Sequence, residues 1–335
     1  MSKNSGERPT ALYYSVLQYE DSSIALLNKY FDLMILDSPN DDTPDILAQC
    51  NVLFAPLGYF LGREKIRYCN KLRVVASNTT GHPHIDVEFL RERDIDVVTL
   101  KGQTELLNSV TPTAELTWGL IIALTRNLIP AFESVKNGNW NRRPYGAGRM
   151  LSHMTLGVVG YGRLGKMVAG IGTAFGMKVL CFDPYQSMYD ENHQRVFSLK
   201  ELVANSDIVT LHVPHEEETE NLVDEEILSC FRVGAFLINT SRGEIIDHQA
   251  LLEALRSRKL GGAAIDVIEG EFCHGFQVSD HELWAYGREN SNLLISPHIG
   301  GSTRDAWKIT EEYAIKKAVE LVTQKKFTEH ETSRH

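Results

Sequence analysis

The stretch Thr155-Leu-Gly-Val-Val-Gly-Tyr-Gly-Arg-Leu-Gly165 decides the fold of this chain. An apolar run typical of a buried strand ends in three glycines, Gly160, Gly162 and Gly165. Apolar residues then recur three and four positions apart, which predicts a helix with one buried face. Strand, glycines and helix in this order are typical of a unit that binds the diphosphate of a dinucleotide.

Each glycine in this run has a separate physical use. Gly160 permits a tight turn, Gly162 lets the backbone approach a pyrophosphate, and Gly165 lets the helix pack closely on the strand. The helix begins near Arg163 and Leu164, where free N–H groups and the positive end of the helix dipole favour a phosphate. Taken alone, the glycines also fit a turn in an unrelated α/β protein.

Asp183 distinguishes these two interpretations. It ends the next apolar run, Lys178–Phe182, at roughly the ~20-residue spacing at which an acidic residue meets the ribose hydroxyls. A 2′-phosphate near this carboxylate would be repelled by about 4 kcal/mol at ~4 Å and an effective dielectric constant of ~20. The following residues, Pro184 to Gln186, include no arginine to offset that repulsion. We therefore expect NAD as the cofactor rather than NADP.

The same stretch partly fits the phosphate loop of nucleoside triphosphatases, through Gly160, Gly165 and Lys166. That loop needs a Ser or Thr hydroxyl for Mg²⁺ where this chain has Met167. A thioether is a poor ligand for so hard a cation, so the dinucleotide site is favoured.

The rest of the chain extends this unit in both directions. At 335 residues it is longer than one core usually grows, so two domains are expected. Short apolar runs alternate with helical patterns throughout, which predicts an α/β fold made of two Rossmann-like, doubly wound lobes. Five strands are expected in the first lobe and six in the second: 11–17, 33–36, 51–55, 72–77 and 95–100, then 155–159, 178–182, 208–211, 235–239, 262–266 and 292–295.

Three helical patterns lie between the strands of the first lobe, at 22–30, 63–70 and 86–93. A long helical stretch, 113–137, connects the lobes and is expected to be interrupted at Pro130. The last helical segment, 304–323, is amphipathic, and we expect it to dock on the first lobe.

Chemically useful side chains follow three strands of the second lobe. Arg242 follows the strand that ends at Asn239, Glu271 closes a carboxylate-rich segment that begins at Asp266, and His298 follows the last strand. Open parallel sheets hold their ligands at the carboxyl ends of the strands. We therefore expect an arginine, a carboxylate and a histidine to converge there.

At this point the chain resembles the D-isomer-specific 2-hydroxyacid dehydrogenases, a family that includes phosphoglycerate dehydrogenases, glyoxylate or hydroxypyruvate reductases and D-lactate dehydrogenases. The resemblance covers nearly the whole chain. Its motifs are VVGYGRLG with Asp183, LHVP at 211–214, INTSRGEIID at 238–247, AAIDVIEGE at 263–271 and SPHIGGST at 296–303. It implies an NAD-binding domain, residues 103–302, inserted in a split flavodoxin-like substrate domain, residues 1–102 and 303–335.

The resemblance also implies roles for individual residues. Arg242, Glu271 and His298 would be the catalytic residues. Further cofactor contacts would come from Pro214, Thr240, Asp266 and Gly300, in addition to Gly160, Gly162, Arg163, Leu164, Gly165 and Asp183. The loop Asn78, Thr79, Thr80 and Gly81 would hold the substrate carboxylate together with Arg242. Asp266 also fits a purely structural role at the end of its strand.

Hydride transfer to a 2-keto acid explains why these residue types are needed. Arg242 can bind a carboxylate through two charge-assisted hydrogen bonds. His298 can donate a proton to the carbonyl oxygen during reduction and remove it during oxidation. Glu271 on the other imidazole nitrogen would fix the tautomer and favour the protonated ring.

The sequence departs from the family in three places. Phe272 follows the catalytic glutamate where the family usually has Pro, and the link to His281 is long. Pro83-His84 stands where the family tends to have Asp-Asn. The arginines of the phosphoglycerate type are missing near 56–60, which disfavours a phosphorylated substrate. The short segment after the last helix leads us to expect no attached regulatory domain.

Two rival functions stay open. A formate-type or phosphite-type dehydrogenase shares the fold. Glu271 disfavours the formate type, because the formate enzymes of the family have Gln at this position. An NAD-sensing binding protein, like the corepressors that resemble this family, would bind NADH without significant turnover.

Composition limits the partners and the compartment. The net charge of −10 and the absence of a basic run disfavour nucleic acid and acidic membranes. Five scattered cysteines, with no apolar leader or spanning segment, are typical of a cytoplasmic protein. His82 with His84, and His212 with His215, lack a third metal ligand at a recognisable spacing, so no metal is expected. Glu115, Thr117 and Trp118 fit either the family's homodimer interface or simple packing.

Overall fold

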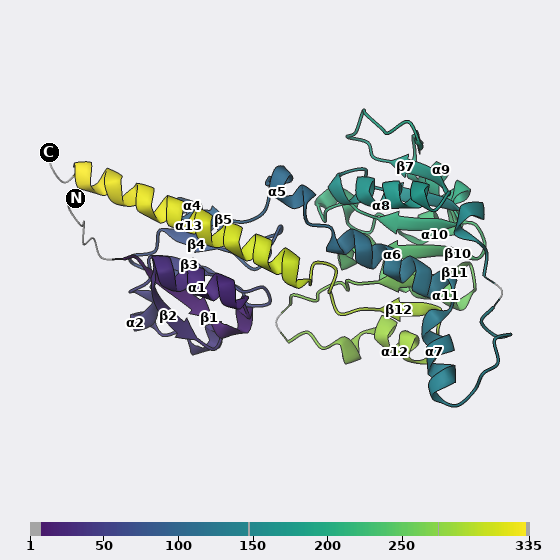
Figure 1. Cartoon of the computed structure of the whole chain (residues 1–335), viewed down its shortest axis with the longest axis horizontal. Coiled ribbons are helices and arrows are strands. Elements are labelled where there is room, and N and C mark those ends of the chain that lie inside the picture. The colour runs from purple at the N-terminus through teal and green to yellow at the C-terminus, as the bar shows by residue number, and fades with distance from the viewer. Residues whose placement is uncertain (1–7, 147, 274, 333–335) are drawn as a thin grey trace. The chain divides into compact units, whose positions relative to one another are not determined.

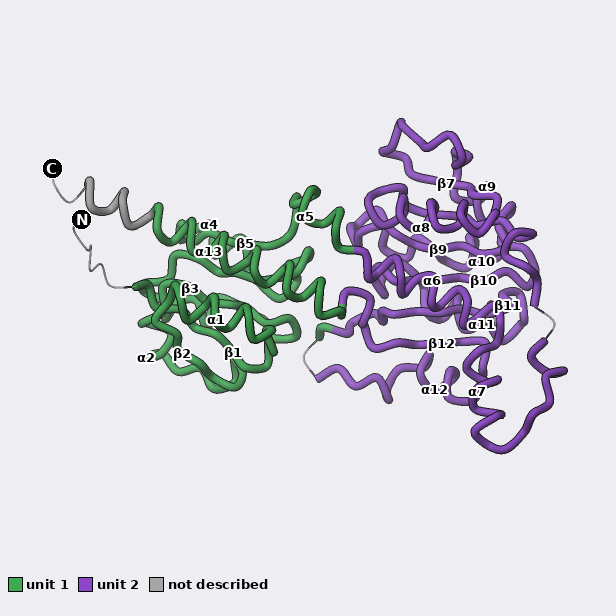
Figure 2. Tube along the Cα trace, viewed as in Figure 1, with its two compact units in different colours: residues 1–110, 272–274, 302–335 green, residues 111–271, 275–301 purple. Residues whose placement is uncertain are grey.

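The computed structural model describes residues 8–146, 148–273 and 275–332, and it divides into two compact units (Figures 1 and 2). Unit 1 comprises residues 1–110, 272–274 and 302–335, and unit 2 comprises residues 111–271 and 275–301. Each unit contains one parallel β-sheet with helices on its faces. The expected α/β fold with two doubly wound lobes is therefore confirmed.

The sheet of unit 1 has five parallel strands in the order β2-β1-β3-β4-β5. This is the order of flavodoxin-like folds. The strands are β1 (Thr10–Tyr14), β2 (Asp32–Leu36), β3 (Val52–Phe54), β4 (Val74–Ala76) and β5 (Asp96–Val98). The helices are α1 (Asp21–Tyr30), α2 (Pro44–Leu47), α3 (Arg63–Ile66), α4 (Val87–Glu92), α5 (Thr104–Asn108) and α13 (Arg304–Thr332).

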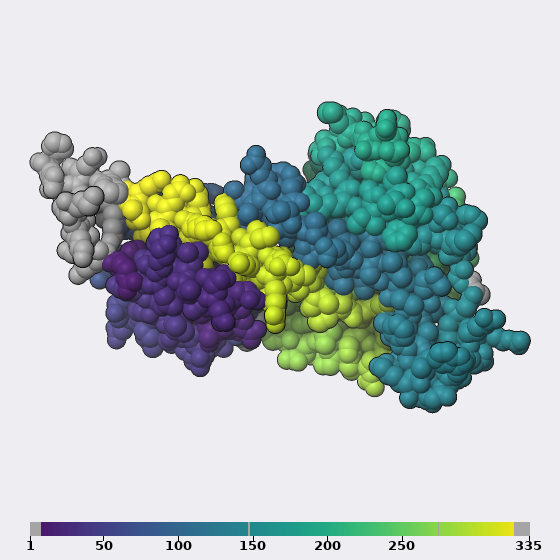
Figure 3. All heavy atoms as spheres, viewed as in Figure 1, coloured from purple at the N-terminus to yellow at the C-terminus, as the bar shows by residue number. Residues whose placement is uncertain are grey.

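Both faces of this sheet are buried, as its apolar strands require. Along β1, Leu12 and Tyr14 enter one core, while Ala11 and Tyr13 enter the core on the opposite face. The second core also contains three residues of α13, namely Ile315, Ala318 and Val322. The yellow helix α13 accordingly packs against α1, β4 and β5, and it lies beside the purple N-terminal part of the unit in Figures 1 and 3. The predicted docking of the last helix on the first lobe is confirmed.

The sheet of unit 2 has seven parallel strands in the order β12-β11-β10-β9-β6-β7-β8. They are β6 (Thr155–Val159), β7 (Lys178–Phe182), β8 (His193–Arg195), β9 (Ile208–Leu211), β10 (Ala235–Asn239), β11 (Leu260–Ile265) and β12 (Leu293–Ile295). The chain runs outward from β6 in one direction and from β9 in the other. Ligands of open α/β sheets bind at such a switch point, beyond the carboxyl ends of the strands.

The helices of unit 2 cover both faces of this sheet. They are α6 (Pro112–Thr125), α7 (Leu128–Lys136), α8 (Arg163–Ala174), α9 (Leu199–Asn205), α10 (Glu225–Cys230), α11 (His248–Arg256) and α12 (Glu282–Glu289). Short 3₁₀ helices occur at Ser15–Leu17, Pro39–Asp41, Leu151–His153, Glu217–Thr219, Gly243–Ile245 and Val278–Asp280 across the two units. In the part of the chain that the structure describes, no helix is long and apolar enough to cross a membrane.

Two local details differ from the sequence-based expectations. The long helix breaks into α6 and α7 at Asn127, which has a left-handed φ of 52°, and not at Pro130. Pro130 lies in the first turn of α7, where its missing N–H is not needed by the helix. The seventh strand, β8, was not predicted because His193–Arg195 is short and polar, as an edge strand often is.

Candidate active site

The glycine turn connects β6 to α8 at the carboxyl edge of the unit 2 sheet. Gly160 has a φ of 87°, and a Cβ there would collide with the carbonyl of His212 at the end of β9. A Cβ on Gly165 would collide with the carbonyl oxygen of Gly160. These two glycines are therefore required by the packing of the protein itself.

Gly162 differs from its neighbours because the space beside it is open. No heavy atom of the described residues lies within 4 Å of the position that a Cβ would take, and its φ of −80° suits any residue. Gly162 is also the N-cap of α8, whose first turn contains no acidic residue. An open cradle at the positive end of a helix fits the diphosphate of a dinucleotide.

Asp183 follows β7 and lies beside the glycine turn. Its carboxylate accepts hydrogen bonds from the backbone N–H groups of Tyr161 and Tyr185, both at 2.8 Å. These bonds hold a partly exposed carboxylate in a fixed position next to the turn. The arrangement suits hydrogen bonding to a ribose hydroxyl, and the charge disfavours a 2′-phosphate.

The loop after β10 carries Arg242 and is organised by Asn239. The buried Asn239 amide donates to the carbonyl of Arg242 at 2.7 Å, and its oxygen accepts from the backbone N–H and the hydroxyl of Ser241 at 3.0 and 2.7 Å. The guanidinium of Arg242 donates to the carbonyl of Ser241 at 2.6 Å and is partly exposed. Asn239 thus shapes the turn that presents Arg242, a role that the sequence analysis missed.

Gly243 brings the Arg242 loop against the loop that carries Glu271. A Cβ on Gly243 would collide with the backbone of Ile268 and Glu269, so the two loops touch at this point. The N–H of Gly270 also donates to the carboxylate of Glu244 at 3.3 Å. Any larger residue at position 243 would force the two loops apart.

His298 and Glu271 form a hydrogen-bonded pair. Nδ1 of His298 lies 2.8 Å from Oε1 of Glu271, and the side chains are 31% and 13% exposed. An ionised carboxylate only accepts hydrogen bonds, so Nδ1 carries the proton of this bond. Glu271 therefore favours the tautomer of a neutral His298 ring that has its proton on Nδ1.

The backbone around His298 is held by Asp266. His298 has a left-handed φ of 51°, which is uncommon for a residue with a side chain, and its N–H donates to the carbonyl of Asp266 at 2.9 Å. The Asp266 carboxylate accepts from the N–H groups of Ile299 and Gly300 at 3.0 and 2.7 Å and from the Ser296 hydroxyl at 2.5 Å. This buried carboxylate therefore fixes the whole turn that presents His298.

The remaining predicted cofactor contacts lie at the same sheet edge. Pro214 follows β9 and is exposed, and Gly300 is buried against Asp266. Thr240 is also buried, and its hydroxyl lies 2.8 Å from that of Thr117 on α6. Because the Thr117 hydroxyl donates to the carbonyl of Thr113, Thr240 donates to Thr117, and packing within the unit accounts for Thr117.

The predicted substrate loop, Asn78 to Gly81, belongs to unit 1 and follows β4. The Thr79 hydroxyl donates to the carbonyl of Gly81 at 2.6 Å and lies 2.9 Å from the hydroxyl of Ser77. His84 is buried, with Nε2 3.2 Å from the Ser77 hydroxyl, so it supports this loop. In the described residues, no three His, Cys, Asp or Glu side chains are grouped to hold a metal ion.

Comparisons with known proteins identify the family. The NAD binding domain of the D-isomer specific 2-hydroxyacid dehydrogenases matches residues 118–300. A glyoxylate reductase of Aeropyrum pernix is 32% identical in an alignment of 295 residues, which covers 84% of this chain and 84% of the relative. The chain belongs to the D-isomer specific 2-hydroxyacid dehydrogenase family. The predicted family and NAD as the cofactor are therefore confirmed.

Two further members of the family show how far the likeness extends. A D-3-phosphoglycerate dehydrogenase of Methanocaldococcus jannaschii is 34% identical over 265 residues, or 78% of this chain. The chain spans about half of that relative, 48% of its length. The structure of a D-lactate dehydrogenase of Aquifex aeolicus, complexed with NAD and lactic acid, matches with a TM-score of 0.79 and 28% identity. That match covers 94% of this chain and 96% of the other.

Proposed function

We propose that this enzyme transfers a hydride between NAD and C2 of a small D-2-hydroxy acid or 2-keto acid, with Arg242, Glu271 and His298 as its catalytic residues. The observation that carries the proposal is the hydrogen-bonded pair of His298 and Glu271, which share one sheet edge with the Arg242 loop and the glycine turn. The relatives named glyoxylate reductase and D-lactate dehydrogenase act on acids of this class.

The cofactor would be held along that edge of unit 2. Gly160, Gly162, Arg163, Leu164 and Gly165 would contact its diphosphate, and Asp183 its ribose. Pro214, Thr240, Asp266 and Gly300 would complete the contacts, with Thr240 acting through its backbone because its hydroxyl is bonded to Thr117. When bound, NAD supplies or accepts the hydride.

The substrate carboxylate would be bound by Arg242 and by the backbone of Asn78, Thr79, Thr80 and Gly81. A guanidinium binds a carboxylate through two parallel hydrogen bonds, which orients the adjacent carbonyl. By this assignment residues 103–302 bind the cofactor, and residues 1–102 and 303–335 bind the substrate. Family relationship is the support for this division and for a homodimer.

Proton transfer would be carried out by His298. With Nδ1 held by Glu271, a charged ring donates a proton from Nε2 to the carbonyl oxygen during reduction, and a neutral ring accepts it during oxidation. Glu271 compensates the positive charge of the ring. Asp266 has a positioning role through the turn that it holds.

The test is a survey of NADH oxidation with glyoxylate, hydroxypyruvate, pyruvate, phenylpyruvate, 2-ketoglutarate and phosphohydroxypyruvate. We expect turnover with at least one unphosphorylated acid, and we expect Arg242→Met to raise its KM at least about 100-fold, because two charge-assisted hydrogen bonds are lost. NADH binding should be unchanged in that variant. NADH binding without turnover of any acid would instead favour a sensor.

A further inference from the structure

Tyr161 lies between Gly160 and Gly162 in the glycine turn, yet its side chain is only 2% exposed. The two glycines have no side chain that could hold the turn, and glycine adopts a wide range of backbone conformations. Tyr161 is therefore the one residue of these three whose side chain can fix the turn from inside the protein. The sequence analysis assigned no function to it.

The hydroxyl of Tyr161 is held by the segment that follows β7. It lies 2.6 Å from Nδ1 of His193, and the two rings meet edge to face with their centroids 5.7 Å apart. The backbone N–H of Asp190 donates to the same hydroxyl at 3.2 Å. His193 is the one buried residue of β8, so this short polar edge strand supplies the partner of Tyr161.

The direction of the hydrogen bond between Tyr161 and His193 follows from the other ring nitrogen. Nε2 of His193 lies 3.2 Å from the hydroxyl oxygen of Thr173 on α8, and that hydroxyl donates to the carbonyl of Ala169 at 3.3 Å. Because the proton of Thr173 is already used, Nε2 of His193 donates to this oxygen. Nδ1 of a neutral His193 ring then accepts from Tyr161. The pair connects the glycine turn with both β8 and α8.

Tyr161 is also connected with Asp183. Its backbone N–H donates to the Asp183 carboxylate at 2.8 Å. The hydroxyl of Tyr189 donates to the carbonyl of Asp183 at 3.1 Å, and the ring of Tyr189 stacks on that of Tyr161 with the centroids 4.6 Å apart. Tyr161 thus joins the turn that would bind the diphosphate to the carboxylate that would bind the ribose.

Filling of the core does not by itself account for a tyrosine at this position. A phenylalanine would occupy the same space in the apolar cluster that contains Val158 and Val168. Burial of a hydroxyl is unfavourable unless the hydroxyl is hydrogen-bonded, and here it has two partners. A fully bonded polar group inside a core favours one conformation over the alternatives.

We propose that Tyr161 and His193 hold the glycine turn in the conformation that binds the dinucleotide, and that both are positioning residues for the cofactor. The inference rests on the proposed cofactor contacts of Gly162 and Asp183. A turn that already has its binding conformation in the free protein gives the cofactor a higher apparent affinity.

Variants of the pair test this role through the Kd for NADH, measured by fluorescence. Tyr161→Phe removes the hydroxyl and keeps the stacked ring, and His193→Leu removes the partner. We expect each variant to raise the Kd about fivefold, the effect of one net hydrogen bond. The double variant should match the single variants to within about twofold, because both lose the same bond. His193→Gln keeps one donor and one acceptor, so its Kd should return to within about twofold of the original value.

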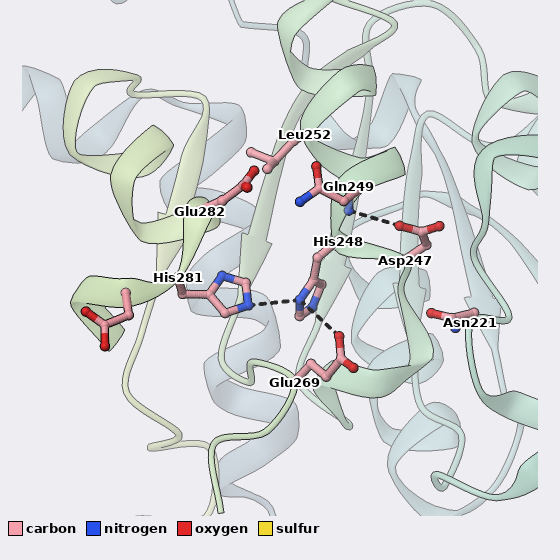
Figure 4. Close-up of a pocket in the computed structure, with 9 residues that line it drawn as sticks. Asn221, Asp247, His248, Gln249, Leu252, Glu269, His281 and Glu282 are labelled. Atoms are coloured by element: carbon pink, nitrogen blue, oxygen red, sulfur yellow. Dashed lines mark hydrogen bonds and ion pairs between the residues drawn. The ribbon is translucent and has the colours of Figure 1, made fainter. Parts of the chain in front are cut away.

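A second buried histidine pair in unit 2 provides the matched control (Figure 4). His248 is 8% exposed, and its Nδ1 lies 3.2 Å from Nε2 of His281. These residues lie at α11 and α12, which pack on β11 and β12, at the opposite end of the sheet from β7 and β8. His248→Leu removes a comparable hydrogen bond there and should leave the Kd for NADH within about twofold.

A further measurement separates positioning of the cofactor from general instability. In Tyr161→Phe the KM for the keto acid, measured at saturating NADH, should stay within about twofold while the Kd for NADH rises. An unchanged Kd in Tyr161→Phe, losses that add in the double variant, an equal rise in KM, or a failure of His193→Gln to recover would overturn the inference.

Failure of the proposed function gives different results. Absence of turnover with every acid would overturn the proposed reaction and leave this test intact, because NADH binding is measured directly. An unchanged Kd for NADH in Gly162→Ala would instead overturn the proposed cofactor contact on which the inference rests.

Discussion

Oε1 of Glu271 lies 2.8 Å from Nδ1 of His298, so the carboxylate holds the proton of a neutral imidazole ring on Nδ1. The pair is 27 residues apart in sequence and is brought together because Asp266 binds the turn after β12. The carboxylate also supplies the charge that compensates a protonated ring. These two effects can be separated experimentally.

Replacement of Glu271 by Gln removes the charge but keeps an oxygen that can accept from Nδ1. We expect kcat to fall at least about tenfold because the positive charge of the protonated ring is no longer compensated. In Glu271→Ala kcat should fall further, because the tautomer of the ring is no longer fixed either. Steady-state kinetics with NADH and the best keto acid provide the measurement. Equal kcat in the original enzyme and Glu271→Gln would refute the assigned role.

Asp183 should control the choice between NAD and NADP. We expect the original enzyme to bind NADH at least about 100-fold more tightly than NADPH, since a repulsion of several kcal/mol acts on the 2′-phosphate. Asp183→Asn keeps the size of the side chain and removes the charge, so the ratio of NADH affinity to NADPH affinity should shrink about tenfold or more. Fluorescence titrations with both nucleotides measure this, and comparable affinities in the original enzyme would contradict the prediction.

Two glycines of one turn should respond differently to alanine. Gly165→Ala collides with the carbonyl of Gly160, so the protein should lose on the order of 2 kcal/mol or more of unfolding free energy. Gly162→Ala meets no atom of the described residues within 4 Å, so stability should be nearly unchanged while the Kd for NADH rises at least about tenfold. Thermal melting with NADH titration compares them. Unchanged NADH affinity in Gly162→Ala would show that the open space beside Gly162 does not hold the diphosphate of the cofactor.

Stability should depend on pH through three histidines with lowered pKa. Burial lowers the pKa of His84, His212 and His248 to about 4 in the folded protein. The unfolded chain, with histidine pKa values of ~6.5, therefore binds more protons between about pH 6.5 and 4. The unfolding free energy should fall as the pH is lowered through this window, by on the order of 2 to 3 kcal/mol per histidine.

Denaturant unfolding at several pH values between 7 and 5 measures this effect. His248→Gln carries no titrating ring and provides the control, because its unfolding free energy should fall less steeply with decreasing pH. A slope identical to that of the original protein would show that the pKa of His248 is not lowered in the folded state.

The strands of both sheets were predictable because apolar runs buried on both faces leave a clear pattern. The edge strand β8 was not, since only His193 of its three residues is buried. The break between α6 and α7 depends on the left-handed backbone conformation of Asn127. No sequence rule indicates that the break falls at Asn127 and not at the nearby Pro130.

Within the site, residues next to a strand end were easier to predict than residues that support them. Arg242 and His298 follow apolar strands and carry unusual chemistry, so their motifs stand out. Tyr161 and His193 are 32 residues apart, and only the order of β6, β7 and β8 in the sheet makes them neighbours. His84 lies buried next to Ser77, where its ring supports the loop after β4.

The most direct test of the account compares the original enzyme with His298→Ala for NADH oxidation on the best keto acid, with NADH binding measured in both. We predict that kcat falls about 10²- to 10⁴-fold, the usual contribution of a general acid, while the Kd for NADH changes little. Turnover that survives the substitution would contradict the assignment of His298 as the acid and base of the reaction.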